Sequence, residues 1–112
     1  MEKRYNLEKL ESLSGGDANF IKQMVELFLN ESESNCVRFE EYQKTNDYDA
    51  MRALAHKIKP TIDLMGLHPT LEEVSQLKDA AEEGTDLERI SDLVGRVNQG
   101  IRGATEDLKR DF

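Results

Sequence analysis

The stretch that decides the fold is DYDAMRALAHKIKPTIDLMGL, residues 47–67. A helix advances about 100° per residue, so apolar residues three or four positions apart share one side of it. Five apolar residues of the stretch are spaced in this way: Met51, Leu54, Ile58, Ile62 and Met65. The pattern predicts an amphipathic helix with this side buried, opened by Asp47 and ended by Gly66.

His56 lies on the opposite side of that helix. On the same helical wheel, Arg52, Lys59, Pro60 and Asp63 fall within about 60° of it, so the imidazole and Lys59 are expected to be exposed. Core packing does not require a histidine there. The residue is therefore a candidate for chemistry or binding.

The charges around His56 differ from those of the rest of the chain. Three cations, Arg52, Lys57 and Lys59, and no acid lie between Asp49 and Asp63, although the chain has 23 acidic and 15 basic residues and a net charge of −8. These cations would suit an anion held on a ring nitrogen of the histidine. The candidate site is thus the exposed face of this helix.

Length and composition favour one domain that spans residues 1–112. The chain has no apolar run long enough to cross a membrane, and its start, MEKRYNLEKL, lacks the apolar core of a signal peptide. Cys36 is the only cysteine, so no internal disulfide can form and a cytoplasmic setting is expected. A small buried side chain is the simplest role for Cys36.

The acidic balance of the chain argues against nucleic acid and anionic membranes as partners, because both are bound by clustered basic residues. A protein partner remains. The two histidines and the cysteine fall on three separate elements without metal-ligand spacing, so no metal and no other cofactor is expected. His68 is expected to cap a helix or to be exposed. We further expect a monomer.

Four other helices follow from caps and periodicity. They are expected at residues 7–14 after Asn6, 18–45 after Asp17, 69–83 with Pro69 first, and from Thr85 or Asp86 onward. Their predicted buried residues are Leu7 and Leu10; Phe20, Met24, Val25, Phe28, Cys36, Phe39 and Tyr42; Leu71, Val74, Leu77 and Ala81; and Leu87, Ile90, Leu93 or Val94, Val97, Ile101 and Leu108. Glu31, Ser32 and Asn35 interrupt the second of these sets. Gly95, Gly100 and Gly103 favour fraying of the last turns of the fifth helix.

No segment shows the two-residue alternation of a half-buried strand. The predicted fold class is therefore all-α: an antiparallel four-helix bundle with an additional short N-terminal helix across one end.

Three motifs resemble the histidine-containing phosphotransfer (HPt) domain family of two-component phosphorelays. They are AHKIK at residues 55–59, LMGL at 64–67 and EEG at 82–84, and the resemblance covers most of the chain. It implies that His56 accepts a phosphoryl group from the aspartyl phosphate of a receiver domain and passes it to another receiver. It also implies that Lys59 helps to hold that group, and that receivers, or a hybrid histidine kinase, are the partners.

Pro60 departs from the family pattern, which has glycine at this position. A proline inside a helix leaves the carbonyl four residues back, here that of His56, without its N–H partner. The sequence therefore predicts a helix kink beside the candidate site.

Two alternatives remain. A histidine kinase dimerisation helix also has a proline shortly after its histidine, but it usually has an acid where this chain has Lys57, and the chain has no nucleotide-binding domain. Autophosphorylation is therefore not expected. The second alternative is a helical adaptor that binds signalling proteins and in which His56 is never phosphorylated.

Overall fold

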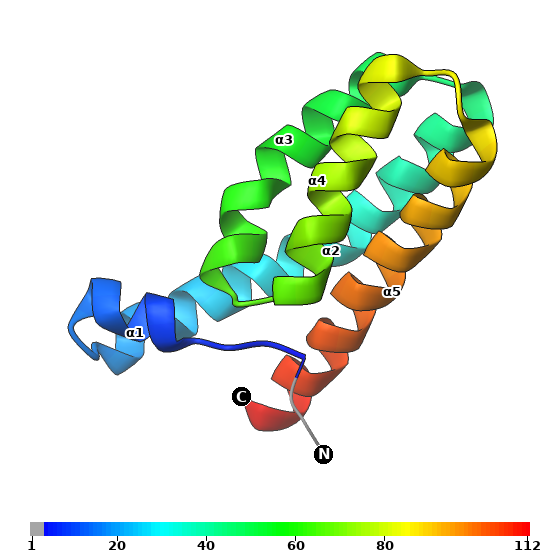
Figure 1. Cartoon of the computed structure of the whole chain (residues 1–112). Helices are drawn as coiled ribbons and strands as arrows, with labels where there is room; N and C mark the ends of the chain where they lie inside the picture. Colours follow the sequence, from blue (N-terminus) through cyan, green and yellow to red (C-terminus); the bar gives the residue numbers. More distant parts are fainter. Residues whose placement is uncertain (1–3) are drawn as a thin grey trace.

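The computed structural model describes residues 4–112, and in this range it contains five α-helices and no strand (Figure 1). The all-α prediction is confirmed. The helices are α1 (Glu8–Ser14), α2 (Ala18–Thr45), α3 (Tyr48–Leu64), α4 (His68–Glu83) and α5 (Leu87–Asp111).

Side-chain caps start three of the helices. Asp17, Asp47 and Asp86 each accept a hydrogen bond from a backbone N–H two or three residues further on. These bonds satisfy donors that have no partner inside the helix, which is why the predicted starts of α2, α3 and α5 agree with the structure. Gly15 and Gly84 end α1 and α4 in the left-handed conformation, also as predicted.

Two helix starts differ by one residue from the prediction. The first helix begins at Glu8, because the Asn6 side chain accepts a hydrogen bond from the Glu8 N–H and Leu7 takes the capping position. The fourth helix begins at His68, which places Pro69 second. Proline is still accommodated there, because the first turn of a helix needs no N–H from it.

The four long helices form an antiparallel bundle, and the molecule measures 44 × 23 × 23 Å. Each packs mainly against two neighbours: α2 against α3 and α5, and α4 against the same two. Figure 1 shows the short α1 beyond one end of the bundle, folded back on the start of α2. No helix in residues 4–112 combines the length and apolar character that a bilayer crossing requires.

The apolar side of α3 is buried as predicted. All five residues of its stripe are 6% exposed or less, and they join one core with side chains from the other helices. That core includes Leu10, Val25, Phe28, Cys36, Phe39, Val74, Leu77, Ala81, Ile90, Leu93, Val94, Val97, Ile101 and Leu108. Burial against the core fixes the rotation of α3, and this rotation directs the opposite side of the helix outward.

Two residues predicted to be buried are exposed. Phe20 is 40% and Leu87 is 55% exposed. The 28 residues of α2 extend about 42 Å and the 17 residues of α3 only about 26 Å, so the first turns of α2 run past α3 and have only α1 beside them. Leu87 is the first residue of α5, where the helix enters from a loop. Periodicity identifies a helix face but not where the neighbouring helix stops.

α5 is continuous to Asp111, and the expected fraying of its last turns stays a prediction. Two of its glycines allow close packing. A Cβ at Gly100 would lie 2.1 Å from the Thr70 hydroxyl oxygen, and one at Gly103 would lie 2.0 Å from the Arg4 guanidinium. A side chain at position 100 would collide with Thr70, whereas the flexible Arg4 side chain beside Gly103 can move.

Gly66, just after α3, has two reasons to be glycine. Its φ of +68° is in the left-handed region, and a Cβ there would lie 2.0 Å from the Asn6 carbonyl oxygen. The same contact holds the N-terminal segment on the bundle, because the Asn6 N–H donates to the Met65 carbonyl at 3.0 Å.

Candidate functional site

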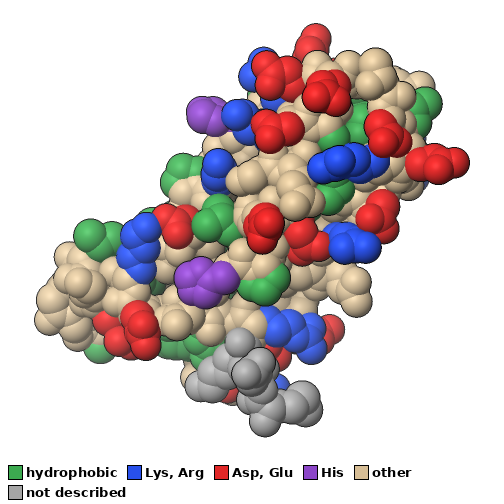
Figure 2. All heavy atoms as spheres, viewed as in Figure 1, with side chains coloured by type: hydrophobic (Ala, Val, Ile, Leu, Met, Phe, Trp, Pro, Cys, Tyr) green, Lys and Arg blue, Asp and Glu red, His purple; other side chains and the backbone are tan. Residues whose placement is uncertain are grey.

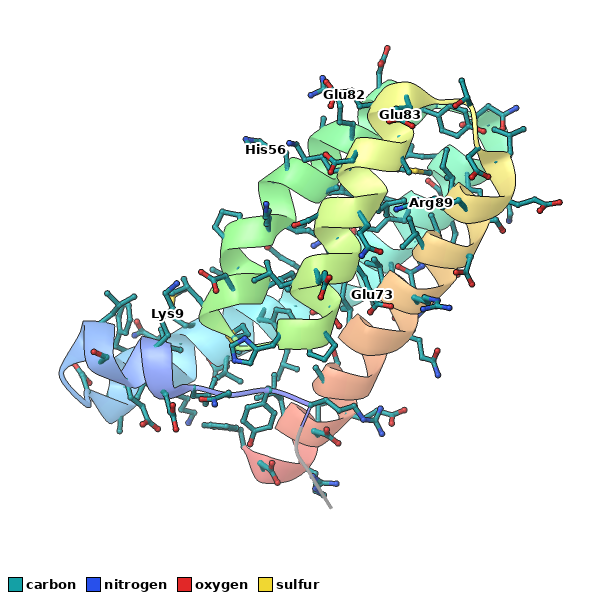
Figure 3. The ribbon with its side chains drawn as sticks, viewed as in Figure 1. Lys9, His56, Glu73, Glu82, Glu83 and Arg89 are labelled. Atoms are coloured by element: carbon teal, nitrogen blue, oxygen red, sulfur yellow. The ribbon has the colours of Figure 1, made fainter. Side chains whose placement is uncertain are left out.

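His56 lies near the middle of α3 and is exposed, as the helical wheel predicts. Figure 3 shows its ring directed away from the other helices. Within residues 4–112 the imidazole has no hydrogen-bond or ion-pair partner. Both of its neighbours toward the core, Ala55 and Ile58, are buried, so the backbone beneath the ring is held by packing.

The cations around His56 also have no ion-pair partner among the described residues. Lys57 is exposed, whereas Arg52 and Lys59 are half-buried. The expectation of a fully exposed Lys59 is therefore wrong: the apolar stem of the side chain lies partly against the protein, as long cationic side chains commonly do. The charged groups stay free to bind an anion.

Some cations elsewhere in the described residues are paired with acids. Arg102 of α5 binds Glu33 at 2.8 Å and Glu40 at 3.3 Å, both on α2. Lys9 of α1 forms an ion pair with Asp63, two turns after His56. Asp63 is one of two acids seven residues from His56 on the same side of α3, and the other, Asp49, has no ion pair among the described residues. Sequence reasoning missed the pair of Lys9 with Asp63, because nothing local indicates that α1 reaches the end of α3.

α3 continues through Pro60 to Leu64, and Pro60 is exposed. Because Pro60 is on the outer side of the helix, the His56 carbonyl that it leaves without an N–H partner is accessible to water. Hydration of this carbonyl lowers the free-energy cost of the proline. The kink that Pro60 predicts stays a prediction.

A groove lies beside the site, between α2 and α3. It has a volume of about 340 Å³, and its lining includes Lys57 and Thr61 from α3 and Asn35 and Arg38 from α2. Apolar side chains of the core, among them Phe28 and Ile58, also line it. The polar residues that interrupt the apolar stripe of α2 were the signal for this groove in the sequence.

The only cysteine is unsuited to be a nucleophile. Cys36 is fully buried, and this burial raises the pKa of its thiol to about 12. The nearby Arg102 guanidinium acts in the opposite direction but more weakly. The thiol therefore stays protonated and packed in the core.

His68 is exposed at the first position of α4, close to the C-terminal end of α3. Figure 2 shows the two histidine side chains well apart on one face of the molecule. Across residues 4–112, no group of three or more His, Cys, Asp or Glu side chains is arranged to hold a metal ion.

Comparison with known proteins found no matching family model, no matching curated protein and no matching solved structure. The functional argument therefore rests on the residues of this chain and on their geometry.

Proposed function

We propose that this protein is a cytoplasmic phosphorelay intermediate, in which His56 accepts a phosphoryl group from one receiver domain and donates it to another. One observation carries the proposal: the exposed imidazole has no hydrogen-bond or ion-pair partner among residues 4–112, and it lies among three cations that have no ion-pair partner there either. The resemblance of AHKIK, LMGL and EEG to the HPt family supports it independently of that geometry.

The chemistry needs little from this chain. The unprotonated ring nitrogen attacks phosphorus with its lone pair, so that a phosphorus–nitrogen bond forms as the phosphorus–oxygen bond of the aspartyl phosphate breaks, and the other ring nitrogen can then release its proton to solvent. The released aspartate keeps the electron pair of the broken bond. Such transfers depend on positioning and electrostatic stabilisation, with the receiver supplying the metal ion and the acidic pocket.

The cations of α3 account for the remaining requirement. A phosphoryl group adds a charge of about −1.5 to −2, and side chains three or four residues away on a helix are within reach of it. Arg52 is four residues before His56 and Lys59 is three after it, while Lys57 is adjacent in sequence. All three would stabilise the phosphorylated state and the transition state that leads to it.

The groove between α2 and α3 offers a receiver a place to dock beside His56. Leu27 lies on the α2 face that leads to it and is 50% exposed. Burying this side chain against a partner would contribute to binding without disturbing the core.

The test is phosphorylation of wild-type and variant protein by a panel of phosphorylated receivers. His56→Gln should fold normally and take up no acid-labile phosphate, because the amide is not a phosphoacceptor. The matched control His68→Gln, which also replaces an exposed histidine, should be labelled like wild type. The wild-type protein and the two variants should not label themselves when incubated with ATP and magnesium.

Three results would overturn this proposal. Label that persists in His56→Gln, or that is lost in His68→Gln, would assign the phosphate to another residue. Receivers that bind the wild-type protein but never transfer phosphate to it would identify a helical adaptor instead.

A further inference from the structure

A second cavity lies at the other end of α3, where the N-terminal segment, the start of α4 and the middle of α5 meet. Its volume is about 870 Å³, and six of its lining residues carry the argument: Arg4, His68, Thr70, Glu73, Arg96 and Gly100. The eight residues from His56 to the end of α3 at Leu64 extend about 12 Å, and none of the cations around His56 lines this cavity, so it is separate from the phosphoacceptor.

The start of α4 presents unpaired donors to this cavity. Its capping residue is Leu67, which has no side-chain acceptor, and Pro69 has no N–H. The backbone N–H groups of His68 and Thr70 therefore have no partner within residues 4–112. The N-terminal end of this 16-residue helix also carries the positive end of the helix dipole.

Thr70 supplies an independent indication of a ligand. The residue is only 4% exposed, lines the cavity, and its hydroxyl makes no hydrogen bond to any described residue. The hydroxyl oxygen packs against Gly100, where a Cβ would lie 2.1 Å from it. The only fully buried side-chain oxygen or nitrogen without a partner in residues 4–112 is Asn98 Oδ1, so the Thr70 hydroxyl oxygen still reaches solvent in the cavity, where it is available to a ligand.

The charges around the cavity favour an anion. Arg4 and Arg96 line it, and Glu73 is the only acid among its described lining residues. The Arg4 guanidinium also lies 3.6 Å from the carboxylate of Asp107, which does not line the cavity. The Arg96 guanidinium contacts Asp92 at 3.0 Å in an ion pair whose two side chains are both 61% exposed. Exposed pairs of this kind are weak, and a guanidinium has five N–H donors, so Arg96 keeps donors for a ligand.

We propose that this cavity binds a phosphate group, either as free phosphate or as part of a small phosphate monoester. Helix N-termini bind phosphate through their free N–H groups, and the Thr70 hydroxyl and the two arginines add donors from other directions. The cavity is larger than one phosphate and within the size range of small-molecule sites, so an organic group can be accommodated, with Glu73 accepting its hydroxyls.

The test uses the full chain and two probes, inorganic phosphate and ribose 5-phosphate, with sodium chloride at matched ionic strength as the blank. Both probes are titrated while the amide NMR signals of His68 and Thr70 are followed. We expect saturable shifts at these two amides with at least one probe. Equal affinity for the two probes assigns the site to free phosphate, and tighter binding of ribose 5-phosphate assigns it to a monoester.

Variants connect the binding to the named residues. Arg96→Gln and Thr70→Val should each weaken binding roughly tenfold, because each removes a hydrogen bond to a charged ligand. Arg89→Gln is the matched control, since it makes the same charge change on an exposed residue of α5 outside the cavity, and it should leave the affinity unchanged. Figure 3 labels Arg89 on α5 and Glu73 on α4.

The proposal is overturned if neither probe shifts the two amides saturably, or if Arg89→Gln weakens binding as much as Arg96→Gln, which would indicate attraction by overall charge. His56→Gln should bind both probes like wild type. This variant tests phosphate binding in the cavity without the proposed phosphoacceptor. The two proposals are therefore tested independently, and the failure of one does not contradict the other.

Discussion

A change at Lys59 should reduce the rate of phosphoryl transfer strongly and the stability of the protein only slightly. Lys59 makes no hydrogen bond or ion pair with the described residues, so Lys59→Ala loses only the partial packing of its stem, worth less than about 1 kcal/mol of unfolding free energy. The same change removes a charge-assisted contact to the phosphoryl group, which should slow transfer to His56 by roughly tenfold to a hundredfold. Urea unfolding and single-turnover transfer measure the two effects.

Lys78→Ala is the control for Lys59→Ala. Lys78 is also half-buried, lies on the neighbouring helix α4 and has no ion-pair partner among the described residues. Lys78→Ala should lose about as much unfolding free energy as Lys59→Ala, but it should transfer phosphate at the wild-type rate. If Lys59→Ala transfers as fast as wild type, Arg52 or Lys57 holds the phosphoryl group instead.

At the scale of one element, Pro60 should affect both the stability of α3 and the position of His56. Replacing it with Ala restores the hydrogen bond to the His56 carbonyl and provides a strong helix former. We expect unfolding free energy to rise by less than proline's full interior penalty of about 3 kcal/mol, because the surrounding packing already accommodates the proline. Transfer should slow, since reacting atoms tolerate little displacement. Pro60→Gly should stay active and lose stability.

Pro69→Ala tests the stability part of this prediction. Pro69 is at the second position of α4, where its missing N–H has no acceptor inside the helix, so alanine should bring little gain. If Pro60→Ala is less stable than wild type and transfers equally fast, proline serves local packing and has no connection with the position of His56.

Between elements, Arg102 ties α5 to α2 through Glu33 and Glu40. Its hydrogen bond to Glu33 lowers the pKa of that carboxyl group, which means that folding favours the carboxylate. The stabilisation is therefore present above the unfolded pKa, near 4.5, and is lost as the pH falls through the lower folded pKa. Arg102→Gln should reduce the melting temperature at pH 7, and the difference from wild type should shrink below about pH 4.

Arg89→Gln should melt like wild type at both pH values, because Arg89 has no ion pair within the described residues. A difference between Arg102→Gln and wild type that is as large at pH 3 as at pH 7 would show that the arginine stabilises the protein by packing rather than by charge. Thermal unfolding followed by circular dichroism is sufficient for both variants.

At the scale of the whole molecule, the features that the sequence predicts best are those that depend on interactions between residues close together in the chain. Asp17, Asp47 and Asp86 bond to N–H groups within three residues, so their helices could be located without tertiary information. The exposure of Phe20 could not be predicted, because it depends on where α3 ends relative to α2. The need for glycine at position 100 could not be predicted either, because it arises from Thr70, thirty positions away.

The same limit applies to the candidate site. The helical wheel predicts that His56 faces solvent and that Lys59 is near it. That the cations have no partners depends on side chains that local spacing does not bring together. The pairing of Lys9 with Asp63 and the hydroxyl of Thr70 without a partner are likewise products of packing between segments distant in the chain.

The unpaired cations of α3 also give the molecule an uneven electric field. The chain carries a net charge of −8, yet this one helix face carries excess positive charge. Fields of this kind extend about 8 Å into solvent at physiological ionic strength. A partner whose reactive group is surrounded by acids is repelled by most of the surface and drawn toward α3, so it is turned into a productive orientation during diffusion, before any side chains of the two proteins touch.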